Sequence, residues 1–161
     1  MKRTVICAVL ACAAIAPATA QSSRVCQEMS GKLNELILPQ VAAPNDPFGR
    51  ILGTVRGSLQ GSTTAFLTTF QPSPNGDIKL TVTDTFSTEE GNQLFTKGQG
   101  QWTAVKPGFL ATDLTLVVAG GTGKFRDATG SLRLQGIGNN VAPGTGQFIQ
   151  EYRGTICYST Q

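Results

Sequence analysis

Apolar and polar residues alternate with a period of two through most of this chain, and this restricts it to β-structure. The clearest example is Asp77–Phe86, in which one face carries five residues: Ile78, Leu80, Val82, Asp84 and Phe86. Successive side chains of a strand point to opposite faces, so this pattern predicts a strand with one buried face. Asp84 is the charged residue on that otherwise apolar face.

The same alternation recurs from Arg50 onward between turn signals such as 72–76 and 89–92. It predicts seven strands, or eight if one splits: 50–59, 62–70, 77–86, 93–105, 109–119, 131–137 and 147–158. Short strands without intervening helices favour an antiparallel sandwich or barrel. Glycines inside the predicted strands mark bends of the kind a small barrel needs, so we favour a closed antiparallel barrel of seven to eight strands over residues 50–161.

Residues 21–49 show no strand alternation that we recognise. Leu33, Leu36 and Ile37 have the spacing of a helical turn, and Pro39, Pro44 and Pro47 then interrupt any regular element. We therefore expect an irregular N-terminal arm here.

Residues 1–20 have the form of a bacterial export signal. Lys2 and Arg3 precede an apolar run, and 18–20 is a small-residue cleavage site. A lipoprotein signal with acylated Cys12 is the second interpretation. Both predict a protein exported to the periplasm or medium, and the apolar run is too short for a membrane-spanning helix.

Charge and composition exclude several functions. Removal of residues 1–20 leaves 11 Lys+Arg against 10 Asp+Glu, without basic runs, which argues against nucleic-acid binding. The chain contains no histidine, which excludes Ser-His and Cys-His catalysis and argues against a metal site. We expect no cofactor. An oligomer is compatible with the sequence.

Cys26 and Cys157 are the cysteines that remain after cleavage of the signal segment. Two cysteines in an exported chain favour a disulfide, which here would join the two ends of the mature protein. A redox pair is the alternative.

A glycine-rich link at 117–130 is the most specific motif. Gly120, Gly121 and Gly123 allow positive φ between two strands, Gly130 ends the link, and Phe125 is an apolar anchor. The link fails the phosphate-loop pattern at two of four fixed positions and also fails the dinucleotide-binding pattern. We therefore interpret it as a structural hinge.

The hinge sequence Gly-Gly-Thr-Gly-Lys-Phe-Arg-x-Ala-x-Gly at 120–130 resembles a segment of allene oxide cyclase and dirigent barrels. The motifs at 53–65, 72–76 and 153–157 are similar to those of small exported bacterial proteins assigned to the same superfamily. The resemblance covers about residues 50–158. It implies an eight-stranded barrel with an apolar interior, in which cyclases fold an unstable epoxide and dirigent proteins steer the coupling of radicals. It does not assign a reaction.

Three residues are candidates for ligand contact: Asp84, Gln150 and Tyr152. A carboxyl group lining the barrel would be desolvated and its pKa raised, whereas Asp84 would be wetted if the strand ended near Val82. Gln150 and Tyr152 share a face of the last strand, although a tyrosine there is more often a core residue.

Other polar residues favour structural roles. Glu151 and Arg153 form an expected exposed pair of little energetic consequence, and Arg126 and Asp127 are expected to brace the hinge. Trp102 is an expected core or rim residue.

Three functions agree with these patterns. The first is binding of a small apolar or amphipathic molecule, which requires an interior pocket of about 300 Å³. The second is a cyclase-like or dirigent-like isomerase that steers a reactive substrate by shape. The third is a structural or interaction scaffold with a solid interior.

Overall fold

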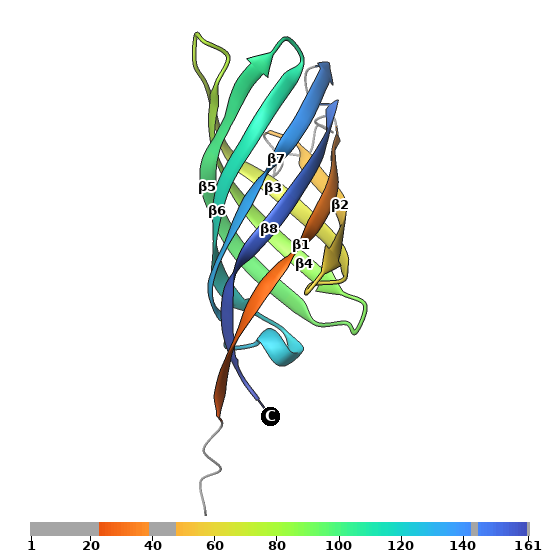
Figure 1. Ribbon diagram of the computed structural model, residues 1–161, viewed down its shortest axis with the longest axis vertical. Coiled ribbons are helices and arrows are strands. Elements are labelled where there is room, and N and C mark those ends of the chain that lie inside the picture. The colour runs from red at the N-terminus through yellow and green to blue at the C-terminus, as the bar shows by residue number, and fades with distance from the viewer. Residues whose placement is uncertain (1–22, 39–47, 143–144, 161) are drawn as a thin grey trace, which may run out of the picture.

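The computed structural model describes residues 23–38, 48–142 and 145–160, which form a closed antiparallel barrel of eight strands (Figure 1). The strands are β1 (Arg24–Leu38), β2 (Arg50–Gly57), β3 (Gly61–Pro72), β4 (Ile78–Thr88), β5 (Gln93–Lys106), β6 (Phe109–Gly121), β7 (Thr129–Ala142) and β8 (Thr145–Ser159). Each strand pairs with its neighbours in sequence, and β1 pairs with β8 to close the sheet. A single 3₁₀ turn, η1 (Gly123–Phe125), links β6 to β7. The predicted all-β barrel is confirmed.

The prediction of an irregular arm over 21–49 is wrong for Arg24–Leu38, which forms β1. Met29, Leu33 and Ile37 point into the barrel, and Glu35 occupies the inward position between the last two. This buried charge hides the strand alternation in the sequence. Without β1, both β2 and β8 would keep an open edge, so the barrel domain begins before residue 50. The proline segment 39–47 lies outside the described residues.

The predicted strand bounds 131–137 and 147–158 are too narrow, because most of the intervening segment 138–146 is strand. β7 continues to Ala142 and β8 begins at Thr145. Pairing between the two strands overrides the turn-forming composition of the segment, because each added residue pair satisfies backbone groups that a loop would leave exposed.

Glycines at inward positions make room for large side chains of neighbouring strands. A Cβ at Gly138 would lie 2.1 Å from the Phe148 ring, and one at Gly31 would lie 2.5 Å from the Tyr152 hydroxyl. The interior is therefore packed by complementary pairs of glycine and aromatic residues on adjacent strands.

A β-bulge between Leu67 and Thr69 reverses the faces of β3. Uninterrupted alternation would place Phe66 and Phe70 on one face of this strand. In the structure Phe70 lies opposite the inward Leu80, and its ring meets Trp102 edge-on at 6.3 Å. The bulge thus turns Phe70 into the barrel interior. It lies towards the end that carries the β3–β4 and β5–β6 turns, the upper end in Figure 1.

The lower end of the barrel in Figure 1 carries η1, the β2–β3 and β4–β5 turns and the end of the chain. Phe125 of η1 is fully buried there, with its ring 5.7 Å from that of Tyr158. The hydroxyl of Tyr152 accepts a hydrogen bond from the Leu59 amide at 2.7 Å. These contacts close the lower end with a side-chain plug.

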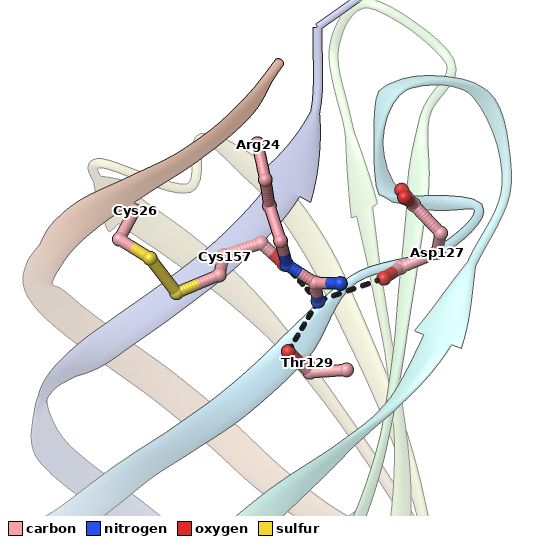
Figure 2. The surroundings of a disulfide bond; sticks show 5 residues. All are labelled: Arg24, Cys26, Asp127, Thr129 and Cys157. Carbon is pink, nitrogen blue, oxygen red and sulfur yellow. Dashed lines mark hydrogen bonds between the residues drawn. A yellow bond between two sulfur atoms is a disulfide. The ribbon is translucent and has the colours of Figure 1, made fainter. Parts of the chain in front are cut away.

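The disulfide predicted between Cys26 and Cys157 is confirmed, and it joins directly opposed residues of β1 and β8 (Figure 2). Beside it, the Arg24 guanidinium donates to the carbonyl oxygens of Asp127 and Cys157, both at 3.3 Å, and to the Thr129 hydroxyl at 2.5 Å. The bridge and these bonds fix the seam at which the first and last strands close the barrel. Such a disulfide fits an oxidising compartment.

In the part of the chain that the structure describes, no helix has the length and apolar character needed to cross a membrane.

Candidate functional site

Among the described residues, six polar side chains are buried inside the barrel, each from a different strand: Glu35, Thr63, Asp84, Thr96, Thr112 and Gln150. Asp84 is 6% exposed and lies between the inward residues Val82 and Phe86. The alternative that Asp84 is wetted beyond the end of its strand is wrong, because β4 continues to Thr88. Two carboxyl groups, those of Asp84 and Glu35, therefore lie in the interior.

Glu35 is held by a relay of hydrogen bonds. The Gln150 amide nitrogen Nε2 donates to Glu35 Oε2 at 2.5 Å, and the Thr112 hydroxyl donates to Gln150 Oε1 at 3.0 Å. Gln150 pairs with Gly136, which pairs with Thr112, so the second bond spans a strand. Because Gly136 has no side chain, it leaves the space through which these two side chains meet.

Asp84 has one side-chain partner among the described residues. The Thr96 hydroxyl donates to Asp84 Oδ2 at 3.0 Å. The hydroxyl of Thr63 is buried and has no hydrogen-bond partner in the described part of the chain. The interior thus has hydrogen-bonding capacity that its own side chains do not use.

Burial raises the pKa of both carboxyl groups. The pKa of Glu35 rises to about 8, first because the group is desolvated and second because of the charge of Asp84, while the bond from Gln150 opposes the shift. The pKa of Asp84 rises to about 7 through desolvation, opposed by the bond from Thr96. Because the two groups interact, they titrate as a pair, and near neutral pH the pair retains at least one proton.

A small void lies between the two carboxyl groups. Its volume is about 10 Å³, and its lining includes Glu35, Asp84, Gln150 and Trp102. A space of this size accommodates about one water molecule. The pocket of about 300 Å³ expected for a ligand-binding barrel is therefore not open in this structure, and the interior is filled by side chains.

Aromatic rings form a stack at the upper end, next to the void. Trp102 stacks on Phe148 with ring centres 4.9 Å apart, and Phe70 meets Trp102 at 6.3 Å. Phe48, which is 40% exposed, stacks on Phe70 at 6.3 Å. This aromatic stack, defined as Phe48, Phe70, Trp102 and Phe148, extends from the two rings that line the void, Trp102 and Phe148, to the exposed ring of Phe48.

The structure brings together two of the three predicted ligand contacts. Asp84 and Gln150 both line the void, whereas the Tyr152 hydroxyl is bonded to the β2–β3 turn at the lower end. Sequence reasoning missed Glu35 because it treated the first strand as an arm. The alternation of Met29, Leu33 and Ile37 about Glu35 was the signal that could have revealed it.

The remaining predicted residues occupy supporting positions. Gly120 and Gly123 have φ values of +94° and +56°, a region that favours glycine. The Asp127 carboxylate accepts bonds from the amide and the hydroxyl of Ser159. Glycine at the turns and this bond to β8 hold the hinge against the barrel.

The rest of the predicted residues are two glycines of the hinge and three charged side chains. Gly121 and Gly130 lie in the same hinge, where a Cβ would come within 2.0 and 2.1 Å of carbonyl oxygens. Arg153 and Glu151 form an exposed ion pair at 3.4 Å, and Arg126 is exposed. No group of three or more metal-ligating side chains occurs within the described ranges.

The acidic pair can perform two kinds of chemistry. A protonated carboxyl group in an apolar interior donates a strong hydrogen bond to an acceptor oxygen, and an ionised partner accepts a proton. The pair therefore combines a donor and an acceptor in a site from which bulk water is excluded.

These features define a closed, eight-stranded antiparallel barrel with an acidic interior. A solved structure with a similar chain path is that of a pterocarpan synthase dirigent protein, with 16% identity, coverage of 86% of this chain and 87% of that chain, and a TM-score of 0.47. No family model matches the sequence, and no curated protein matches it.

Proposed function

We propose that this protein is an exported barrel that binds a small, largely apolar molecule carrying an acceptor oxygen, such as a carbonyl or ether group. The oxygen would accept a hydrogen bond from the protonated member of the Glu35–Asp84 pair. The observation that supports this proposal is the placement of two buried carboxyl groups on one interior void.

The energetic cost of the pair favours a functional role over a purely structural one. A carboxyl group removed from water destabilises a fold unless it is fully paired, and an apolar side chain of similar volume is often more favourable. Here Asp84 has one side-chain donor, and the hydroxyl of Thr63 has no partner within the described residues. Polar groups retained in a core against stability are typical of binding sites.

Access to the pair would require movement of the aromatic stack. Trp102 and Phe70 lie at the upper end, and their rings would make way for a ligand and then cover its apolar part. Binding would therefore change the surroundings of Trp102 directly.

The same geometry supports a second function, in which the barrel steers or isomerises the bound molecule as well as binding it. A donor aimed at an epoxide or carbonyl oxygen would stabilise the negative charge that develops there, and the closed barrel would fix the substrate's shape. The filled interior favours a different candidate, a non-enzymatic scaffold that acts through its outer surface.

Nuclear magnetic resonance of the indole N–H of Trp102 tests the proposal, because the chain contains one tryptophan. Cyclohexanone is the probe, and methylenecyclohexane is the matched neutral molecule without an acceptor oxygen. We expect a saturable shift of the indole signal with cyclohexanone that weakens between about pH 6 and pH 9, as both carboxyl groups lose their protons.

Asp84→Leu should abolish the response, and Asp113→Asn, which alters an exposed carboxyl group, should preserve it. Native mass spectrometry of protein purified from the cells that make it should then show a bound small molecule. An unshifted indole signal together with a bare protein mass would overturn the proposal and leave the scaffold.

A further inference from the structure

A groove on the outside of the barrel has the character of a second binding site. Its volume is about 980 Å³, within the range of small-molecule sites, and it runs over the outer face of β7 and β8 and the neighbouring edges of β1 and β6. It lies on the side of the sheet opposite the acidic pair, so it is independent of the proposed interior site.

The apolar part of the groove is a directly opposed pair of isoleucines. Ile137 on β7 and Ile149 on β8 are cross-strand partners, 60% and 58% exposed. Phe109, 38% exposed, lines the groove beyond them, and its ring carries Lys106 Nζ at 4.3 Å from its centre. Adjacent apolar side chains at this exposure mark a surface whose removal from water would be favourable.

The charged part lies four residues further along the same two strands, at about 13 Å from the isoleucine pair. Arg133 and Arg153 are also direct cross-strand partners. Like charges in this position destabilise a sheet. Arg133 is bonded to Asp113 at 2.9 and 2.7 Å, whereas Arg153 has a longer contact of 3.4 Å with Glu151.

A third cation adjoins the arginine pair. Lys32 of β1 lies opposite Glu151 and has no ion pair or hydrogen bond from its side chain to any other described residue. The charged residues that line the groove are Lys32, Arg133, Arg153 and Glu151; with the Asp113 carboxylate bonded to Arg133, the net charge of this end is +1. One end of the groove is therefore electropositive and the other apolar.

We propose that this groove binds a free, single-chain amphiphile with a phosphate-monoester head. The head would lie between Arg153, Lys32 and the remaining donors of Arg133, and the chain would cover Ile137 and Ile149. A phosphate monoester carries about −1.5 to −2 charge at neutral pH and is attracted to this electropositive end, and guanidinium groups bind its oxygens in a directed way. The bound anion would also relieve the repulsion between the two opposed arginines.

Calorimetric titration of the whole mature protein with monododecyl phosphate, below the concentration at which it forms micelles, tests this proposal. We expect one molecule bound per chain, with methyl resonance shifts at Ile137 and Ile149 and an unchanged Trp102 indole signal. Arg153→Gln should weaken binding by about tenfold, since a hydrogen bond to a charged group is lost. Ile149→Thr should weaken it by several-fold.

Matched controls separate this site from general adsorption. Val105→Thr replaces an equally exposed β-branched residue, 62% exposed, outside the groove and should bind as the wild type does. Inorganic phosphate alone should bind far more weakly, and dodecyltrimethylammonium should not compete. Circular dichroism checks that each surface variant is folded.

Four results would overturn the proposal. The first is that dodecyltrimethylammonium binds as tightly as monododecyl phosphate, and the second is that each chain takes up many molecules of the phosphate. The third is that the protein binds only to vesicles that contain anionic lipid, and the fourth is that it forms a dimer in which the methyl groups of Ile137 and Ile149 are already covered. A shift confined to Trp102 would also refute it while supporting the interior site, so the two sites fail separately.

Discussion

Replacement of Asp84 by asparagine should change the pH dependence of stability in a way that follows from the buried pair. The side chain keeps its size and its partner Thr96 but loses its charge. The folded protein has pKa values of about 8 for Glu35 and about 7 for Asp84, against ordinary values of 4.5 and 3.8. Between about pH 5 and pH 7 the folded chain therefore keeps protons that the unfolded chain has released.

The sign and size of the effect follow from this difference. The stability that the protonated pair contributes is fully present below the pKa values of the unfolded chain, 4.5 and 3.8. It is lost as the pH rises through the pKa values of the folded protein, about 8 and about 7. Each retained proton lowers the free energy of unfolding by up to about 1.4 kcal/mol per pH unit, so the wild type should lose up to about 3 kcal/mol per unit. Asp84→Asn should lose about half as much per unit.

Urea unfolding of both proteins between about pH 5 and pH 7 measures these slopes. The absence of histidine from the chain removes the side chain that ordinarily titrates in this window. Asp113→Asn is the control: its bond from Arg133 lowers the pKa of Asp113, so that group titrates below the window and the slope should match the wild type. Wild-type stability that is constant or rises with pH, or an unchanged slope in Asp84→Asn, would refute the reasoning.

Two substitutions and the reduction of the disulfide test the packing of the barrel by denaturant unfolding. Tyr152→Phe leaves the buried Leu59 amide without its acceptor and should cost about 1–3 kcal/mol; a neutral effect would show that water replaces the hydroxyl. Reduction of the bond between Cys26 and Cys157 should cost about 2–4 kcal/mol, and a smaller loss would mean that Arg24 holds the seam unaided. Gly138→Ala should cost about 1–3 kcal/mol through a clash with the neighbouring ring, unless that ring can move.

The barrel could be predicted because its alternation is regular from Arg50 onward and its turns carry ordinary signals. Ile78–Thr88 kept its predicted inward face, and Asp84 was identified as a buried carboxyl candidate from that face alone. The first strand was missed because Glu35, a charged residue, stands where the pattern requires an apolar one. Its burial depends on Gln150, which is 115 positions away in sequence, so local patterns could not indicate it.

The filled interior could not be predicted for a related reason. Alternation shows which residues point inward, but the free volume depends on how neighbouring strands are paired. Gly138 admits the Phe148 ring, and the bulge after Leu67 turns Phe70 inward; both depend on register. A one-residue shift in the register of β7 with β8, or of β3 with β4, would have changed the free volume of the interior.

The central claim is that an acidic pair in the barrel interior remains protonated near neutral pH, which gives the proposed site its donor. Carbon-13 NMR titration of the side-chain carboxyl groups measures this directly, with Glu35 and Asp84 assigned from the Glu35→Gln and Asp84→Asn variants. We expect two carboxyl midpoints, at about 8 and about 7, well above all the others. Midpoints for both groups in the ordinary range near 4 would contradict it and remove the basis of the proposed interior site.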